Sequence, residues 1–479
     1  MNLLHRAKKT AKNRGLWARC AAVILAATGS ISGGATAEEN QSKLQPVINA
    51  PSQKTLTFDW PILKVGTGEY TEGPTGVSVL HFDKHVLVAA DVRGGGPGTV
   101  NTDYMALGYD IAELDTVVFA GGSWYGLEAV TAVATALKDD GIRDGNAFGA
   151  DANIAMSVGS IIFDFGGRRL NEIYPDKKLA QAAFRAAKTG EFPLGAHGAG
   201  RFAKSGGFFG CNAFSGQGGA FRQIDDVKVA AFIIANPYGV ITDRDGNPAA
   251  CFGGKDWPEN VSTADLMQNF PESRGADWNG PASSASNKNT TISLIVTNQK
   301  LSPADLKRLA VQVHTSLGRG IQPFATQFDG DVLYAVSTQE LEEQAFSSPA
   351  LGVIASEVMW DALLSSVPEQ PTAPKPAEAP LHSAEDLAAF VGEYKFSQFV
   401  DVQVTADGNK LYAQATGKRR AFAITKDKRT ELLAVSKTEF TILGRYPLSI
   451  YFDGKGAMTF NPGHWQQVGK RGVGGSDFN

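Results

Sequence analysis

The 479-residue chain has only three cysteines, too few for a scaffold held together by several disulfides, and none of them forms a C-x-x-C pair typical of zinc or redox sites. It also lacks a G-x-S-x-G nucleophile elbow, an H-E-x-x-H pair and a P-loop. Histidine is scarce, at seven residues. Histidine-based catalysis and metal-dependent hydrolysis are therefore poorly supported.

The chain has no excess of positive charge. Lys and Arg number 45 against 49 Asp and Glu, for a net charge of -4, and nucleic-acid binders usually carry a basic domain or stripe. The hydrophobic share of 43% is ordinary for a globular protein, and no apolar run is long enough to span a bilayer. We therefore expect two or three globular domains, with neither a nucleic-acid partner nor a membrane span.

Residues 1–37 have the pattern of an export signal. Six Lys and Arg residues come first, residues 20–31 are apolar and small, and Ala35-Thr36-Ala37 fits a small-x-small cleavage site. This predicts a periplasmic or secreted protein; the alternative is a frayed cytoplasmic tail. After removal of the leader only Cys211 and Cys251 remain, and pairing or two buried thiols are about equally compatible with the sequence.

The rest of the chain divides in two at a proline-rich stretch. Residues 38–367 mix apolar runs with amphipathic stretches: strands are expected at 77–80, 86–90, 229–235 and 291–297, and helices at 127–138, 179–188, 302–317 and 354–364. Residues 368–380 (PEQPTAPKPAEAP) predict an extended linker. Residues 381–479 alternate in short segments between turn signals, which predicts a small β domain, either a sandwich or a barrel.

A polar stretch, residues 281–289, runs directly into the apolar strand that starts with Thr290. A hydroxyl at such a position is placed as in N-terminal-nucleophile hydrolases, where it attacks the preceding carbonyl and the freed α-amine later acts as its base. Threonine is also common at strand starts, so the local pattern leaves both interpretations open.

Several blocks of this region occur in one order in a known family. They are RGGGPGT at 93–99, GGSWYGLEA at 121–129, YPDK at 174–177, GQGGAF at 216–221, NPYGV at 236–240, NTTIS at 289–293, RGIQPF at 319–324, DGD at 329–331 and ASEVMWD at 355–361. With these blocks the chain resembles the DmpA-like aminopeptidase/amidase family, and within it the nylon-oligomer (6-aminohexanoate-oligomer) endohydrolases. The resemblance implies an α/β fold, a four-layer α-β-β-α sandwich, and self-cleavage between Asn289 and Thr290.

The resemblance also assigns roles. Thr290 matches the nucleophile, and Asn236 matches the asparagine that donates to the oxyanion. Asp329 and Asp331 match paired carboxylates that hold the Thr290 amine or orient its hydroxyl. Without the family, Asn236 is equally a turn residue before a proline, and Asp-Gly-Asp is a plain turn.

Two positions depart from the family pattern. The family places a lysine after Gly-Ala-Gly, and that position falls here on Gly207; Lys204 replaces it only if the loop shifts. The nylon-oligomer hydrolases have a tyrosine where this chain has Phe163. Both differences concern the hydrogen bonds around the nucleophile and leave the nucleophile itself in place.

Other residues have weaker signals. Arg93 and the following glycines predict a tight loop that shapes the substrate pocket. Trp124 and Tyr125 either line that pocket or belong to the core. His81 and His85 are interpreted as two surface histidines in preference to a metal pair.

The C-terminal domain resembles the small β domain appended to β-lactamase-like hydrolases, through FVGEY at 390–394 and the turn at 453–454. That likeness implies an accessory role and no chemistry of its own.

Taken together, the sequence predicts an exported, self-cleaving N-terminal-threonine amidohydrolase that needs no metal or organic cofactor. We expect it to act on short peptides or linear oligoamides and to form a homo-oligomer of processed heterodimers. The alternative is a non-catalytic envelope-binding protein on an inert fold.

Overall fold

The computed structural model describes residues 41 and 43–472, with gaps at 107–110, 147, 149–152, 166–167, 169–171, 256, 270–275, 278–279 and 282–288. The predicted leader, residues 1–37, lies outside the described residues. No helix in the described part of the chain is long and apolar enough to cross a membrane.

A large mixed sheet is the centre of the fold. Its eleven described strands are β1 (Val47–Ile48), β3 (Leu63–Tyr70), β4 (Thr75–Val92), β5 (Thr99–Val100), β6 (Glu113–Ala120), β7 (Ser157–Ile161), β8 (Lys188–Thr189), β12 (Gln217–Ile224), β13 (Val227–Asn236), β17 (Thr290–Gln299) and β19 (Val332–Leu341). The main order is β12-β13-β17-β19-β4-β6-β7-β5. β17 runs antiparallel to β13 and parallel to β19.

Strand β4 carries the sheet from one half of the fold to the other. It pairs with β3 through residues 75–82 and with β19 through residues 87–92. Asp83 and Lys84 are exposed between these segments, where the register with β6 shifts. The two separate strands expected at 77–80 and 86–90 are therefore one continuous strand, because pairing with β6 continues on both sides of the irregularity.

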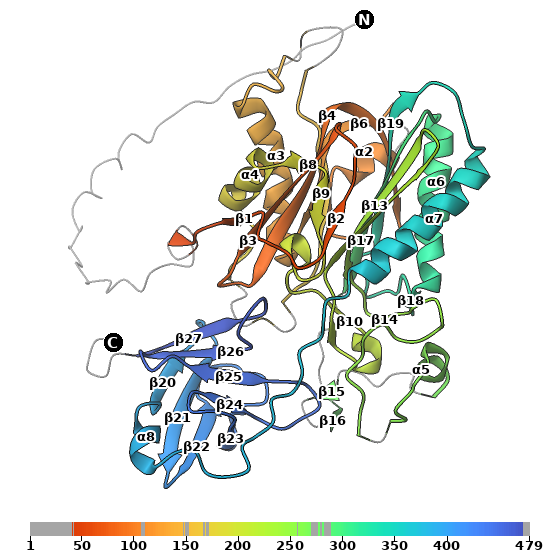
Figure 1. The fold of residues 1–479 in the computed structure, drawn as a ribbon. Helices are drawn as coiled ribbons and strands as arrows, with labels where there is room; N and C mark the ends of the chain where they lie inside the picture. The colour runs from red at the N-terminus through yellow and green to blue at the C-terminus, as the bar shows by residue number, and fades with distance from the viewer. Residues whose placement is uncertain are drawn as a thin grey trace, which may run out of the picture.

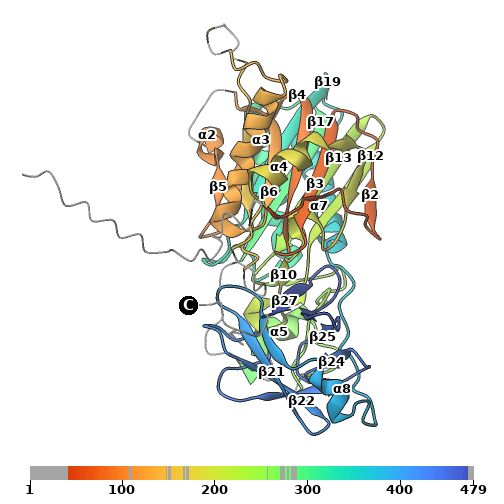
Figure 2. The same ribbon diagram turned by 90° about the vertical axis from the view of Figure 1, so that its left-hand side faces the viewer.

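Helices cover both outer faces, so the layers run α-β-β-α (Figure 1). Helices α3 (Glu128–Asp139) and α4 (Lys177–Arg185) pack on the half that contains β3 and β6, as Figure 2 shows face-on. Helices α6 (Pro303–Ser316) and α7 (Ser348–Ser365) pack on the half that contains β13 and β19. The apolar core between the halves draws on both groups of strands. The predicted four-layer sandwich is confirmed.

The sequence signals for helix ends hold at α6. The Ser302 hydroxyl accepts from the Asp305 N–H, and Pro303 occupies the first turn, as predicted. Helix α7 begins six residues before the predicted start at Ile354, again with a proline in its first turn. The other described helices are short: α2 (Thr102–Ala106), α5 (Thr263–Asn269), α8 (Ala384–Ala388), and the 3-10 turns η1 (Ser123–Leu127), η2 (Gly198–Gly200), η3 (Gly207–Phe209) and η4 (Leu317–Arg319).

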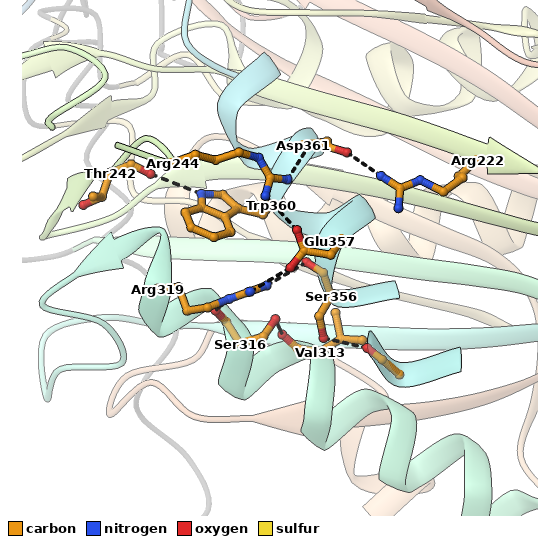
Figure 3. A network of polar contacts seen from close by, with 11 residues as sticks. Arg222, Thr242, Arg244, Val313, Ser316, Arg319, Ser356, Glu357, Trp360 and Asp361 are labelled. Carbon is orange, nitrogen blue, oxygen red and sulfur yellow. Dashed lines mark hydrogen bonds and ion pairs between the residues drawn. The ribbon is translucent and has the colours of Figure 1, made fainter. Parts of the chain in front are cut away.

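An ion-pair network fastens α7 to two neighbouring loops (Figure 3). Arg244 pairs with Glu357 and Asp361, and Arg319 pairs with Glu357. The Trp360 ring lies between these guanidinium groups, 4.7 Å from Arg244 and 4.6 Å from Arg319. The block at residues 355–361 thus anchors a helix in the structure.

Four pairs of short strands complete the sandwich: β2 (Thr55–Thr57) with β9 (Glu191–Pro193), β10 (Lys204–Ser205) with β11 (Ala213–Phe214), β14 (Val240–Ile241) with β18 (Ile321–Gln322), and β15 (Ala276–Asp277) with β16 (Gly280–Pro281). Cys211 and Cys251 form a disulfide, packed beside Phe209 and Leu266. Of the two alternatives for these cysteines, the structure has the paired one.

The C-terminal region is a closed barrel of eight described strands. These are β20 (Gly392–Lys395), β21 (Asp401–Asp407), β22 (Lys410–Ala415), β23 (Thr430–Ala434), β24 (Glu439–Thr441), β25 (Ser449–Phe452), β26 (Ala457–Phe460) and β27 (Gln467–Arg471). Gly408 and Gly454 take positive φ values in its turns, where the sequence predicted them. Residues 367–383 before it contain neither helix nor strand.

The barrel meets the sandwich partly through two facing histidines. The His464 ring lies 4.7 Å from that of His197, whose Nδ1 is 3.3 Å from a Glu69 carboxylate that also pairs with Arg201. Loss of hydration, with the nearby His197 and Arg201 charges, lowers the pKa of His464 to about 4. Burial likewise lowers the pKa of His197. The pKa values of both rings are therefore lowered where the two parts of the protein touch.

Candidate active site

Thr290 and Asn236 lie side by side on adjacent strands. They are register partners at one end of the antiparallel pair β13–β17. Because side chains alternate along a strand, both share the inner face with Ile234 and Ile292, and directly opposite Cβ atoms are about 4.5–5.5 Å apart. Thr290 is 4% exposed and Asn236 is 3% exposed. The structure thus brings together two of the predicted residues, 54 positions apart in the chain.

The Thr290 hydroxyl lies against the carbonyl of the preceding residue. Its Oγ1 donates to the Asn289 oxygen at 2.5 Å, and the Gly330 N–H donates to the same oxygen at 2.9 Å. The parallel bridge between Asn289 and Asp329 sets this geometry. Both donors polarise this carbonyl, and the Gly330 N–H would remain to stabilise the negative charge that an attack by the hydroxyl would create on the oxygen.

Gly330 leaves no room for a side chain beside Thr290. A Cβ atom at this position would lie 2.8 Å from Thr290 Oγ1 and 2.8 Å from the Gly96 carbonyl oxygen. In the sequence this glycine is only the middle residue of a turn-like Asp-Gly-Asp. The one sequence signal for this close packing is a glycine between two acids just before an apolar strand. That pattern does not indicate a neighbouring hydroxyl.

The Asn236 amide is oriented from both ends. Its Oδ1 accepts from the Lys204 backbone N–H at 3.0 Å, and its Nδ2 donates to the Phe163 carbonyl oxygen at 3.2 Å. An amide NH₂ carries two hydrogens, so one remains to donate elsewhere. Phe163 takes part through its backbone carbonyl, which a residue with any other side chain at this position would also supply. The replacement of tyrosine by Phe163 therefore leaves this hydrogen bond intact.

Asp329 and Asp331 are both buried, each 1% exposed. Asp329 accepts from the Tyr238 N–H and from the N–H and hydroxyl of Thr326. Asp331 accepts from the N–H groups of Thr291 and Ala325. Both carboxylates thus bind the backbone that surrounds Thr290, and a contact with its freed amine stays a prediction for the cleaved chain.

Burial raises the pKa of both carboxyl groups. For Asp331 the pKa lies well above its ordinary value, and the neighbouring Asp329 raises it further. Two carboxylates this close and this far from water do not ionise independently. The pair can hold a proton next to the nucleophile.

Lys204 reaches the site with its backbone. Its N–H holds Asn236, while its Nζ lies 4.8 Å from the ring centre of Phe214 and 5.6 Å from that of Phe202. Gly207, where the family lysine would fall, lies beside the Tyr238 ring: a Cβ there would be 3.5 Å from it. Replacement of the family lysine by the Lys204 ammonium stays a prediction.

Arg93 and its glycines form a loop beside Asp329 and Asp331, and the predicted shaping of a substrate pocket by this loop stays a prediction. The N–H groups of Arg93 and Gly94 donate to the backbone carbonyl oxygen of Asp331, and that of Gly96 donates to the backbone carbonyl oxygen of Asp329. The Arg93 guanidinium itself pairs with Asp91 at 2.6 Å. The arginine is therefore engaged in an ion pair, and substrate binding by its side chain stays a prediction.

Trp124 and Tyr125 are 75% and 62% exposed, so the alternative that they belong to the core is wrong. A role for them in lining the pocket stays a prediction. His81 is buried and its Nδ1 lies 3.3 Å from the Asp115 carbonyl oxygen, so the interpretation as a surface histidine was also wrong. Among the described residues, no three His, Cys, Asp or Glu side chains gather as a metal site would require.

Residues 57–374 match the model of Peptidase family S58. The chain belongs to this family. The 6-aminohexanoate-oligomer endohydrolase of Kocuria sp. (strain KY2) is 39% identical over 333 residues, 67% of this chain and 88% of that protein. An uncharacterized aminopeptidase of Mycobacterium leprae (strain TN) is 30% identical over 292 residues, 58% of this chain and 76% of that protein. The structure of a Burkholderia sp. beta-aminopeptidase covers 67% of this chain and 89% of its own, with a TM-score of 0.47 and 16% identity.

The predicted family is therefore confirmed, and this S58 peptidase is an amide-bond hydrolase. The matched region contains every predicted site residue and ends at residue 374, within the linker. The C-terminal barrel lies outside it. The barrel is an addition to the family's domain, and its role has to be worked out from its contacts in this chain.

Proposed function

We propose that this S58 peptidase cleaves its own chain between Asn289 and Thr290 and then uses Thr290 as its nucleophile. The observation that carries the proposal is the pair of donors on the Asn289 carbonyl, the Thr290 hydroxyl and the Gly330 N–H. A hydroxyl already in contact with the carbonyl it would attack needs little movement to react.

In the self-cleavage step, Thr290 Oγ1 bonds to the Asn289 carbonyl carbon and its proton leaves. The carbon–nitrogen bond then breaks, and the nitrogen takes up the proton that the hydroxyl released and becomes the Thr290 α-amine. Water hydrolyses the resulting ester, leaving a carboxylate on Asn289 and a free hydroxyl on Thr290. The Gly330 N–H stabilises the oxygen while it carries negative charge.

The same hydroxyl then serves the substrate. The α-amine, with an ordinary pKa near 8, removes the Thr290 proton as the hydroxyl attacks a substrate amide. The second hydrogen of the Asn236 amide donates to the oxyanion, and Asp329 and Asp331 hold the amine in place. The substrate amine leaves with a proton, and water releases the acyl group.

The substrate class we propose is short peptides or linear oligoamides. The relatives named as aminopeptidase and as 6-aminohexanoate-oligomer endohydrolase support this breadth. A panel of matched amides with free and blocked amino termini separates aminopeptidase action from endo-cleavage. Activity on blocked oligoamides means endo-cleavage, and loss of all activity on them refutes it.

We further propose that the protein is exported and assembles as a homo-oligomer of processed heterodimers. The leader-like pattern of residues 1–37 and the Cys211–Cys251 disulfide support export, because disulfides persist in oxidising compartments. Cell fractionation with mass determination of the mature N-terminus tests the location. Light scattering on the purified protein tests the assembly.

The decisive experiment is the intact mass of the full-length protein under denaturing conditions, beside a Thr290→Ala variant. We expect a fragment that begins at Thr290 and comprises residues 290–479, about 20 kDa at the chain's mean residue mass, and an uncut variant. A wild-type chain that stays whole would refute self-cleavage and would favour an inert fold that only binds its ligand.

A further inference from the structure

Phe214 of the sandwich is held by residues that lie on its C-terminal side in the chain. The linker residue Gln370 bonds to both sides of its backbone: Oε1 accepts from the Phe214 N–H at 2.8 Å, and Nε2 donates to the Phe214 oxygen at 2.9 Å. The barrel residue Trp465 stacks on its ring, with ring centres 4.0 Å apart and an interplanar angle of 22°. Linker and barrel thus fix one phenylalanine from two directions.

This phenylalanine belongs to the two-stranded β10–β11 ribbon, where it is the register partner of Lys204. The Lys204 N–H is the group that orients the Asn236 amide, and the Lys204 ammonium lies 4.8 Å from the Phe214 ring centre. A displacement of Phe214 would therefore move both the backbone and the side chain of Lys204. Asn236 in turn is the register partner of Thr290.

The barrel also holds the loop that connects the two strands of the ribbon. The Tyr446 hydroxyl donates to the Gly210 oxygen at 2.7 Å and accepts from Asn212 Nδ2 at 2.8 Å. Both the loop and the Phe214 end of the β10–β11 ribbon are thus bound by the barrel, which lies next to β10 in Figures 1 and 2.

We propose that the C-terminal barrel contributes to the geometry of the active site. Trp465 of the barrel, together with Gln370 of the linker, positions the Asn236 amide beside Thr290. Trp465 is a positioning residue, because it acts through Phe214 and Lys204 without touching the reacting atoms. The proposal rests on the proposed function of Thr290 and Asn236. It gives a catalytic purpose to a domain that the family match leaves out.

The test compares full-length variants in the rate of self-cleavage and in kcat and KM on an amide substrate. We expect Trp465→Ala to lower kcat at least tenfold while KM changes by less than about threefold, in line with misplacement of a catalytic group. Self-cleavage should keep the wild-type rate, because its oxyanion donor is the Gly330 N–H and not the Asn236 amide. Trp465→Phe, which keeps an aromatic ring against Phe214, restores most of the loss. Gln370→Ala also lowers kcat and leaves the self-cleavage rate unchanged.

The matched control is Arg445→Ala. Arg445 is also a barrel residue at the interface, but its guanidinium donates to the Phe252 oxygen at 2.7 Å and lies over the Trp257 and Tyr446 rings, so its partners among the described residues differ from those of Trp465 and Gln370. We expect this variant to keep the wild-type kcat. Equal losses in Arg445→Ala and Trp465→Ala would show that the barrel merely stabilises the fold and would overturn the proposal.

Failure of the positioning role is distinguishable from failure of the proposed function. A wild-type chain that neither cleaves itself nor hydrolyses amides refutes the function of Thr290. An active wild type with an equally active Trp465→Ala variant refutes only the role of the barrel. If Trp465→Ala does not fold, the comparison of Trp465→Phe and Gln370→Ala with Arg445→Ala decides instead.

Discussion

Replacing Gly330 by alanine tests whether the close packing beside Thr290 matters for the chemistry. The added Cβ would lie 2.8 Å from Thr290 Oγ1 and 2.8 Å from the Gly96 oxygen, when ordinary contacts begin near 3.4 Å. The backbone of Gly330 lies outside the left-handed region, so alanine can adopt it without strain. The hydroxyl, or the N–H that faces the Asn289 carbonyl, must therefore shift by roughly half an ångström.

The expected cost follows from that shift. Misplacing a reacting group by about 1 Å lowers rates on the order of a hundredfold, so a shift of this size predicts self-cleavage slowed by about tenfold or more. The overpacking should also lower the free energy of unfolding by about 1–3 kcal/mol. The assay is the uncut fraction, followed by intact mass after synthesis, together with thermal unfolding of the uncut protein.

Gly96→Ala is the matched control in the same contact. A Cβ at Gly96 would have the Asp329 oxygen as its nearest neighbour, at 3.9 Å, so it fits. We expect wild-type self-cleavage in this variant. Gly330→Ala cleaving at the wild-type rate, or both variants slowed alike, would refute the reasoning from the space beside the hydroxyl.

Three further predictions follow from the described contacts. Asn236→Ala should lower kcat by about 100- to 1000-fold, as loss of one oxyanion donor does, with the fold kept as judged by circular dichroism; an unchanged kcat contradicts its role. Replacing Cys211 and Cys251 by serine should lower the free energy of unfolding by about 2–4 kcal/mol, seen as a lower Tm, whereas an unchanged Tm would mean that the bond contributes nothing. Because the folded pKa of His464 is below its ordinary value, the undocked barrel binds more protons, and docking should weaken as the pH falls from about 6.5 towards 4. Small-angle scattering should show that the protein expands at low pH and that His464→Gln reduces this expansion. His464 remains exposed, so solvent screens part of the effect. A wild-type protein that stays compact over this pH range contradicts the prediction.

The strands and the family could be predicted from the sequence, because apolar runs and ordered motif blocks are local signals. Residues 229–235 and 291–297 read as buried strands, and both are. That Asn236 lies opposite Thr290 could not be predicted from either run, because register between distant strands depends on the whole sheet. The resemblance named both residues, and the structure supplied their pairing.

Other features escaped the sequence analysis for physical reasons. The donors that surround Asp329 and Asp331, backbone N–H groups and the Thr326 hydroxyl, could not be predicted because a buried carboxylate finds its donors only in the fold. Trp465 sits in a turn of a domain with no catalytic set, 251 positions from Phe214, and no spacing rule connects two aromatic rings over that distance. Only the packing of barrel against sandwich reveals the contact.

The strand order β13-β17-β19-β4 has a consequence for the product of the proposed self-cleavage. A cut after Asn289 places β17 and β19 on one fragment and their neighbours β13 and β4 on the other. Each fragment then lacks strands that the other supplies, so the chain must fold before it cuts. After denaturation, the cut protein has to reassemble from two molecules at a rate that depends on concentration. The intact chain refolds within a single molecule. Self-cleavage would therefore make refolding after denaturation harder for the cut protein than the first folding was for the intact chain.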